Sequence, residues 1–379
     1  MKLPLLLSLI SAMAFAAEPG RPEIIRPLAH GPMPTATTAS ALAEAVPARP
    51  DEPLARSFSA ERAAQSLAAG SNAWLKNYSC VQCHAVMMQP QASLALREIS
   101  PPPQEAIRFM TDTVNGHWQK SGVRYDNLPA TGKTLLMRDA KPPVTEPLSI
   151  ALPMTQRDRH DSGRLSDEAR KALLKMAERQ RADGGFNVAR DGVPEMLHEF
   201  DQALLAAIAI GTAPEGVANA APFKTALEGI RRYIAAHPAD CAWQQGMLLW
   251  AEAQAGGFLT SEARQQAMQA LLARQRADGG WSLPDLLTEA TRRQYHLAAD
   301  APADGYATGF VLFVARQSGA AKDDPRLQRG VAWLKTHQRQ SGRWFLASLV
   351  GRKGNLISNA ATAWAVLGLR ACDALPPGT

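Results

Sequence analysis

The sequence predicts an all-α protein built from about six helical hairpins, a number that can close a ring. An internal repeat is the first reason: Arg179 to Phe186 returns almost unchanged as Arg274 to Trp281, and a looser copy spans Gln338 to Trp344. A regular alternation is the second reason. Each copy follows a stretch with charges on one face and precedes a stretch that is small and apolar all round, so outer amphipathic helices should alternate with buried inner helices.

The expected helices follow from this alternation along the chain. The outer helices are expected at 58–76, 102–118, 166–180, 223–236, 261–275 and 324–338. The inner helices are expected at 84–98, 145–156, 203–210, 241–255, 309–315 and 360–369. The first two hairpins are the least regular, because Pro90, Pro147 and the run from Pro101 to Pro103 interrupt them.

The two ends of the chain differ from this pattern. Residues 1–16 join a charged start, the apolar run Leu5 to Ile10 and the segment Ala14-Phe15-Ala16, which is the pattern of a cleavable secretory signal. The run is too short for a membrane anchor, and no later stretch is long enough to cross a bilayer. Residues 17–57, rich in Pro and Ala, are expected to form a linker, 58–372 the helical domain and 373–379 a tail. We therefore expect a periplasmic or secreted protein with no stable membrane anchor.

Composition limits the classes of partner. With 379 residues and 46% hydrophobic content, the chain can bury a substantial core. Its formal charge of +6 comes from Lys and Arg residues scattered along helices that also carry Glu and Asp. A nucleic-acid surface would cluster such charges with aromatic residues, so we expect no nucleic-acid partner.

The repeated Gln, Gly-Gly and Trp pattern resembles the QW motif of the squalene-hopene cyclase and prenyltransferase repeat family. The resemblance is strongest from 166 to 372, the range of the most regular repeats, and Asp304 to Gly309 and Ser358 to Trp364 also look like that family. It implies an α/α toroid. In physical terms, each Gln amide can cap neighbouring backbone groups while the aromatic ring packs over it, which would tie adjacent outer helices together. The residues concerned are Gln180, Gln275 and Gln338 with Phe186, Trp281 and Trp344.

The chemistry of that family is not expected here. Its cyclases protonate their substrate with an Asp-x-Asp-Asp motif, and the nearest segment in this chain, Asp300-Ala301-Pro302-Ala303-Asp304, lacks it. The chain is also shorter than a two-domain cyclase, and export would separate it from isoprenoid diphosphates. The resemblance therefore predicts the fold, and terpene cyclase activity is not expected.

The segment Cys80-Val81-Gln82-Cys83-His84 predicts one covalently bound c-type haem. Cys80 and Cys83 would form the thioether bonds, and His84 would supply the proximal ligand of the iron. A redox dithiol would need a thioredoxin-like strand and helix, and structural zinc would need a fourth ligand. A disulfide between the two cysteines remains an alternative, but it would not explain why His84 directly follows them.

The motif falls at the first turn from an outer to an inner helix, so haem c is expected at one mouth of the ring. Turns of this kind share one rim, which also collects candidates for the distal iron ligand and for a ligand site in the cavity. The distal candidates are His117, His198 and His296, and the cavity candidates are Asp201, Asp304 and Asn359. For each of these residues alone, a capping or surface role is sufficient.

Other candidates for the distal ligand are weaker. Met137 lies in the long turn from 119 to 144, whereas Met87 and Met88 follow His84 too closely to fold back across the haem. His160 lies in a turn from an inner to an outer helix and is therefore expected on the opposite rim.

Three functions remain open for such a protein. The first is electron transfer with a periplasmic redox partner protein, which predicts six-coordinate, low-spin iron. The second is a haem-dependent oxidoreductase acting on a small molecule in the ring cavity, which predicts an open, high-spin site. The third is a non-redox module that binds haem or another ligand. The distal ligand decides between the first two, and we favour a redox function without naming its substrate or partner.

The remaining cysteines, Cys241 and Cys372, are expected to be unpaired thiols. Cys241 opens an inner helix and Cys372 closes another, so in a ring of parallel inner helices they lie near opposite rims. A helix of about 16 residues is about 24 Å long, whereas a disulfide needs Cα atoms within about 7 Å.

Overall fold

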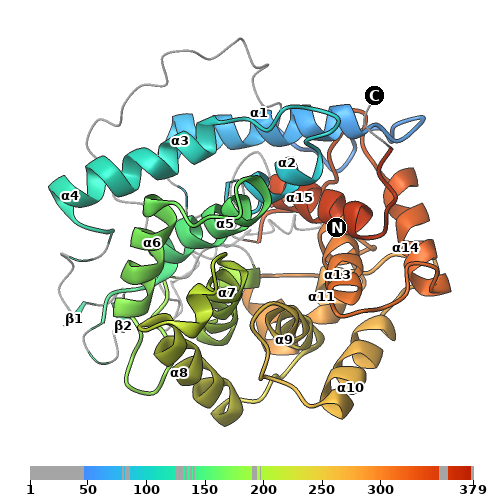
Figure 1. Cartoon of the computed structure of the whole chain (residues 1–379). Coiled ribbons are helices and arrows are strands. Elements are labelled where there is room, and N and C mark those ends of the chain that lie inside the picture. Colours follow the sequence, from blue (N-terminus) through green and yellow to red (C-terminus); the bar gives the residue numbers. More distant parts are fainter. Residues whose placement is uncertain are drawn as a thin grey trace, which may run out of the picture.

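The computed structural model describes residues 47–78, 81, 86–124, 126, 131–132, 135–136, 139, 141–189, 194–196, 198–349 and 357–376. In this part of the chain the helices form a ring of two concentric layers (Figure 1). The strands described are β1 (Thr131–Gly132) and β2 (Leu135–Leu136), which pair antiparallel. The prediction of an all-α toroid is confirmed.

The outer layer consists of helices with a polar face toward solvent. They are α1 (Ala60–Tyr78), α3 (Glu105–Asp112), α4 (Trp118–Ser121), α6 (Asp167–Glu178), α8 (Phe223–Ala236), α10 (Ser261–Leu272) and α14 (Pro325–Thr336). A π-helical turn, Thr113–His117, joins α3 to α4. Two short helices, α11 (Leu283–Leu286) and α12 (Glu289–Gln294), and two 3-10 turns, Pro194–Met196 and Val217–Asn219, lie in the connections.

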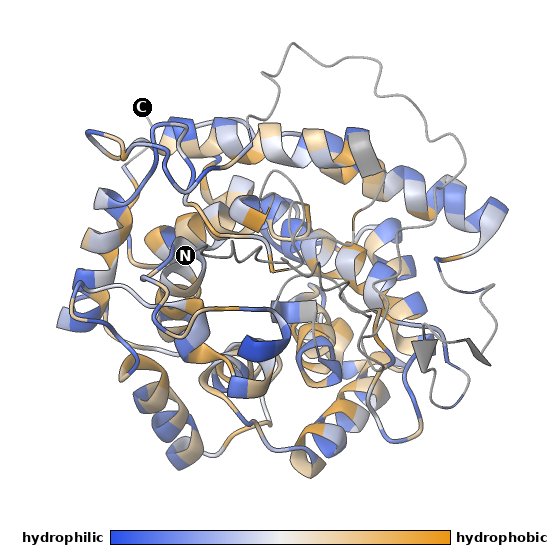
Figure 2. Cartoon of the chain, turned by 180° about the vertical axis from the view of Figure 1, so that it is seen from behind, coloured by the Kyte–Doolittle hydropathy of each residue, from blue (hydrophilic) through white to orange (hydrophobic). Residues whose placement is uncertain are grey.

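The inner layer is apolar on most sides because the outer helices surround it. It consists of α2 (Gln89–Ala95), α5 (Thr145–Asp161), α7 (Glu199–Thr212), α9 (Ala242–Ala255), α13 (Gly305–Gln317) and α15 (Ile357–Ala371). Figure 2 shows this contrast as inner helices that are largely hydrophobic inside outer helices of mixed character. Helices α13 and α15 touch at Gly309, where a Cβ would lie 2.2 Å from the backbone of Trp364, so a side chain does not fit there.

The ring has two distinct rims because the inner helices run in the same direction. Residues near the C-terminal ends of α2, α5, α7, α9, α13 and α15 together line one pocket, and we call this side the C-terminal rim. The turns that lead into the inner helices lie on the other side, which we call the N-terminal rim.

Three glutamine side chains connect successive outer helices. Gln180 donates from Nε2 to carbonyl groups of its own turn and of Ala226 in α8, both at 2.9 Å. Gln275 makes the same pair of bonds to its own turn and to α14. Gln338 makes it to its own turn and to Ser59, just before α1. The last pair of bonds closes the ring.

The aromatic residue of each repeat fills the space beneath its turn. Phe186, Trp281 and Trp344 are all buried. The indole N–H of Trp281 donates to the carbonyl of Leu271 at 3.2 Å, and that of Trp344 donates to the carbonyl of Leu334 at 3.0 Å. The predicted role of each Gln in joining outer helices is therefore confirmed, and the aromatic residue of each repeat is buried.

The residues before α1 pack against the third of these turns. Leu54 forms a bridge with Arg339, and the N–H of Ala55 donates to the carbonyl of Gln338 at 2.7 Å. These residues belong to the range 17–57 that the sequence assigns to a linker, so the end of that range is part of the folded ring. The predicted secretory signal and the start of the linker lie outside the described residues.

Helix α2 differs most from its expected bounds. The sequence predicts a helix over 84–98, whereas α2 spans Gln89–Ala95. Val86 to Met88 form a turn, and Pro90 stands in the first turn of α2, where proline starts a helix instead of interrupting it. Among the helices of the described residues, none has the length and apolar character needed to span a bilayer.

Candidate functional site

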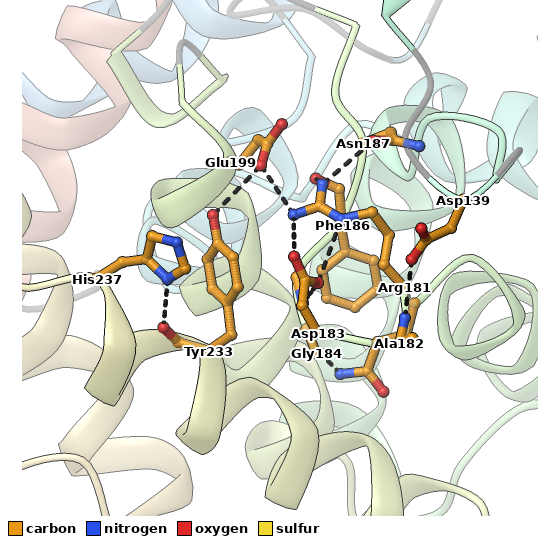
Figure 3. A network of polar contacts seen from close by, with 12 residues as sticks. Asp139, Arg181, Ala182, Asp183, Gly184, Phe186, Asn187, Glu199, Tyr233 and His237 are labelled. Carbon is orange, nitrogen blue, oxygen red and sulfur yellow. Dashed lines mark hydrogen bonds and ion pairs between the residues drawn. The ribbon is translucent and has the colours of Figure 1, made fainter.

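A buried guanidinium holds the turn between α6 and α7 (Figure 3). The Arg181 side chain is fully buried and donates to the carboxylates of Asp183 and Glu199 at 3.0 and 2.9 Å. It also donates to the carbonyl of Phe186 at 2.6 Å, while the hydroxyl of Tyr233 in α8 donates to Glu199 at 3.3 Å. These contacts join the turn after α6 to α7 and α8, so the cluster has a structural role.

A second buried polar group lies inside the ring at the N-terminal rim. Glu195, in the 3-10 turn before α7, accepts hydrogen bonds from the hydroxyl of Tyr306 in α13 and, at 2.7 Å, from the indole N–H of Trp364 in α15. Burial raises the pKa of the Glu195 carboxyl, although both hydrogen bonds favour its charged form. Burial also raises the pKa of Tyr306, and the charge of Glu195 adds to that shift.

Asp201, in the first turn of α7, is fully buried, and neither of its carboxyl oxygens has a hydrogen-bond partner. Desolvation raises its pKa well above the ordinary value, and the charges of Glu195 and Asp240 add to the shift. The indole N–H of Trp243 in α9 lies close enough to oppose this shift, yet it forms no hydrogen bond itself. An unpaired buried carboxylate is costly, so we expect Asp201 to be protonated at neutral pH.

Glu195 and Asp201 thus form an acidic pair that can hold a proton at pH values where a solvated carboxyl releases it. The sequence indicates Asp201 as a cavity candidate and gives little sign of Glu195. Glu195 stands in an irregular turn, and its partners Tyr306 and Trp364 lie 111 and 169 residues further along the chain. The one available signal was an acidic residue between Pro194 and Met196.

Aromatic rings fill the interior of the toroid between the acidic pair and the C-terminal rim. Trp243 stacks on Phe310 with ring centroids 4.0 Å apart, and Phe310 meets Trp364 edge-on at 5.2 Å. Trp364 meets Trp250 at 5.6 Å, and Trp250 meets Phe313 at 5.4 Å. Because four of these rings are at most 1% exposed, with Phe313 the exception, packed side chains separate the acidic pair from the other rim.

A pocket of about 380 Å³ opens at the C-terminal rim. Trp250 and Phe313 form part of its wall, so the aromatic column ends there. The titratable residues that line it are all basic: Arg97, Arg159, His160 and Arg370. The sequence predicts His160 on the rim opposite the outer-to-inner turns, and His160 lines this pocket.

The other two predicted cavity residues lie elsewhere. Asp304 caps α13, since its two oxygens accept hydrogen bonds from the N–H groups of Ala307 at 2.8 Å and Leu283 at 2.7 Å. Burial raises the pKa of Asp304 to about 6. Asn359, in the first turn of α15, packs against α1 at Gly70. The pocket at the C-terminal rim is lined by neither residue.

The predicted haem-binding residues Cys80, Cys83 and His84 lie outside the described residues. Apolar residues on both sides of them are at most 1% exposed: Trp74, Val81, Val86, Met87 and Met88. Close to them in the chain, Ser71 Oγ and Gln89 Oε1 are buried without a hydrogen-bond partner. Two thiols and an imidazole between apolar segments are a donor set that fits a covalently attached haem.

The distal-ligand candidates belong to three different hairpins. His117 ends the π-helical turn before α4, and His198 directly precedes α7; both are half-buried, whereas His296 is exposed. Met137 lies outside the described residues. Within the described residues, no three His, Cys, Asp or Glu side chains are grouped so that they could hold a metal ion.

Comparison with known proteins gives similarity of fold. No protein-family model matches the chain, and no curated protein matches it. Among solved structures, ent-copalyl diphosphate synthase from Streptomyces platensis is similar over 76% of this chain at 12% identity, with a TM-score of 0.47, and the chain spans 50% of that synthase. A family 88 glycosyl hydrolase from Bacteroides vulgatus is similar over 83% of this chain and 99% of its own length, at 10% identity and a TM-score of 0.49.

A type II terpene cyclase from Scytonema is also similar, over 83% of this chain and 99% of its own length, at 12% identity and a TM-score of 0.43. At these identities and TM-scores, the similarities do not bear on the activity of this chain.

Proposed function

We propose that this protein is an exported c-type haem protein with a redox function, built on an α/α toroid. The observation that carries the proposal is the segment Cys80-Val81-Gln82-Cys83-His84, which follows a secretory signal in the same chain. Cys80 and Cys83 would attach one haem, and His84 would hold its iron. When bound, haem supplies an iron centre that accepts and releases one electron.

The residues next to the motif support this proposal. Val81 lies between the two cysteines and is buried, and Val86 to Met88 are buried directly after the motif. Apolar packing on both sides of His84 would anchor the segment and keep water from it, which is one way a protein sets a reduction potential. Ser71 and Gln89 carry buried polar atoms that a bound group could satisfy.

Electron transfer with a periplasmic redox partner protein is the first form of this function. The second is a haem-dependent oxidoreductase acting on a small molecule. The observation that favours the second is the pocket at the C-terminal rim, because α2, the helix that follows the haem motif, contributes Gln91 and Leu94 to its lining. A small molecule bound there would lie beside α2, whereas His84 precedes this helix in the chain; α2 has seven residues and is about 10 Å long, so the separation along it is short.

Covalent attachment is tested by expressing the full chain with a periplasmic haem-maturation system and staining a denaturing gel for haem. We expect a stained mature protein without its leader. Cys80→Ala combined with Cys83→Ala should lose the stain completely, whereas Cys241→Ala combined with Cys372→Ala should keep it. A mature, soluble wild-type protein without covalent haem would show that the proposal is wrong.

Absorption spectra of the purified protein distinguish the two forms of the function. For electron transfer we expect low-spin spectra in both oxidation states and no change when carbon monoxide is added to the reduced protein. For an oxidoreductase we expect a high-spin oxidised spectrum and a carbon monoxide complex. Substitution of His117, His198 and His296 one at a time by Ala would then identify a distal ligand as the variant that converts low-spin iron to high-spin iron.

A further inference from the structure

The pocket at the C-terminal rim gathers positive charge from three separate segments. Arg97 follows α2, Arg159 and His160 lie in the last turn of α5, and Arg370 lies in the last turn of α15. Among the described residues that line the pocket, none is Asp or Glu. Desolvation, together with the charges of Arg97 and Arg159, lowers the pKa of His160, while Asp161 opposes this shift. These cationic groups are therefore close enough to repel one another.

Two of the guanidinium groups lack an acidic partner. In the described part of the chain the Arg97 side chain forms no hydrogen bond or ion pair, and Arg159 contacts the amide oxygen of Gln254 at 3.4 Å. Arg370, in contrast, pairs with Glu98 at 3.4 Å. The C-terminal ends of helices carry partial negative charge and favour nearby cations. This effect explains why basic residues end the inner helices, but it leaves two cations at one pocket without a full counter-charge.

A buried amide gives a second, independent indication of a ligand. Gln91 in α2 lines the same pocket, is only 5% exposed, and its Nε2 has no hydrogen-bond partner. A buried donor without an acceptor is unfavourable, and an acceptor oxygen inside the pocket would satisfy it. Trp250 and Phe313 supply an apolar wall beside these donors.

We propose that this pocket binds a small organic anion, a carboxylate or a phosphate ester, whose apolar body rests against Trp250 and Phe313. The anionic oxygens would accept hydrogen bonds from Arg97, Arg159 and Gln91. The pocket volume of about 380 Å³ lies within the usual range for small-molecule sites, about 300–1,000 Å³. Binding at this site needs no haem, so the proposal holds for either form of the redox function; in the oxidoreductase form, the anion would be the small molecule bound here.

The proposal is tested on the full-length, haem-loaded protein with benzoate and phenyl phosphate as anionic probes. Benzyl alcohol and benzamidine serve as neutral and cationic controls of similar shape. Binding is followed by calorimetry and by the NMR signal of the His160 ring, assigned with His160→Gln. We expect saturable shifts with an anion, a raised pKa of His160 in its presence, and no saturable shift with either control. The stronger of the two anions identifies the carboxylate or the phosphate class.

Variants distinguish this pocket from general attraction to a basic protein. Arg97→Gln combined with Arg159→Gln should weaken binding of the preferred anion at least tenfold. Arg157→Gln is the matched control, because Arg157 lies on the same helix, pairs with Asp161 at 3.2 Å and does not line the pocket; its affinity should stay within twofold of the wild type. Thermal unfolding of each variant shows whether it is folded.

Three outcomes would overturn the proposal. The first is the lack of a saturable response to either anion, and the second is unchanged affinity in the folded double variant. The third is binding that occurs only when Cys80→Ala and Cys83→Ala have removed the haem, which would assign these basic residues to the haem carboxylates instead of a separate ligand.

Discussion

Several charged side chains at the N-terminal rim are bonded within the fold, whereas two basic side chains around the pocket at the C-terminal rim have no acidic partner among the described residues. At the N-terminal rim charges are built into the fold: Arg181 lies between two carboxylates, Glu195 accepts two hydrogen bonds, and Asp304 caps α13. At the C-terminal rim Arg97 and Arg159 surround an open pocket. The helix dipole accounts for Asp304 at the start of α13 and for Arg159 at the end of α5, since acids favour helix beginnings and bases favour helix ends. The dipole does not explain why the charged groups named at the N-terminal rim are buried while Arg97 and Arg159 are exposed.

This difference in burial distinguishes polar groups that stabilise the fold from polar groups that are available to bind a ligand. A buried and fully bonded group holds elements together, so its removal should change stability. A group at an open pocket with unused hydrogen-bonding capacity contributes little to folding, so its removal should change binding.

The largest expected change in stability is at the aromatic residue of the second repeat, on the N-terminal rim. Trp281→Ala removes a fully buried ring and its hydrogen bond to Leu271, so we expect a loss of about 3–5 kcal/mol in the free energy of unfolding. Leu54→Ala, at a side chain that is 45% exposed, should change it by less than about 0.5 kcal/mol. Urea denaturation measures both, and similar effects of the two substitutions would contradict the role assigned to the aromatic residue.

We expect Asp304, at the N-terminal rim, to make the free energy of unfolding depend on pH. The ordinary pKa of 3.8 is raised to about 6 in the folded protein, so the unfolded chain releases this proton first as pH rises. The free energy of unfolding should therefore be highest below pH 3.8 for this group and fall by about 3 kcal/mol as pH rises through about 6. Glu195 and Asp201 shift in the same direction and add to the loss.

Asp304→Asn removes the titration but can still cap a helix. Its amide nitrogen cannot accept the second backbone N–H, so we expect a pH-independent loss of about 1–3 kcal/mol. Urea denaturation at pH values from about 4 to about 7 gives the free energy of unfolding as a function of pH. Its slope should be smaller for this variant than for the wild type. Equal slopes would mean that Asp304 is ionised in the folded protein throughout this range.

Substitution of one glutamine at each rim allows a direct comparison of their contributions to the free energy of unfolding. Gln338→Ala at the N-terminal rim removes the side chain that joins the third repeat to Ser59. The N–H of Ser59 then loses its acceptor and the buried carbonyl of Gly342 loses its donor, so we expect a loss of about 1–3 kcal/mol. Gln254→Ala at the C-terminal rim removes a half-buried side chain bonded to Arg159 and Gln317, and should cost less than about 0.5 kcal/mol. Equal losses would remove the distinction between the rims.

The sequence predicted the regular parts of this molecule because they repeat. The outer helix, the Gln and the aromatic residue recur together, so the positions of α6, α10 and α14 followed from one pattern. Helix α2 was shorter than expected, because a proline can start a helix as well as interrupt one.

The polar sites could be predicted only in part. The sequence indicates Asp201 because it lies in a turn from an outer to an inner helix, whereas Glu195 stands in an irregular turn and its hydrogen-bond partners come from distant segments. The pocket at the C-terminal rim was missed for a similar reason. In the sequence, each basic residue of this pocket is an ordinary base near a helix end. Only the closed ring brings Arg97, Arg159 and Arg370 together.

The smallest expected effect concerns two thiols that mark the two rims. Cys241 precedes α9 at the N-terminal rim, Cys372 follows α15 at the C-terminal rim, and both are free, as the sequence predicts. Burial raises the pKa of Cys241 to about 12 and that of Cys372 to about 11, so both remain protonated at neutral pH and should react slowly with iodoacetamide. We expect neither to be labelled in the folded protein within minutes, and both to be labelled in urea.

Mass spectrometry of the non-reduced protein should find no peptide that links them, since a helix of about 15 residues is about 22 Å long and a disulfide needs Cα atoms within about 7 Å. A linked peptide would place both cysteines on the same rim, which would contradict the common direction of the inner helices and therefore the assignment of Arg181 and Arg159 to opposite rims.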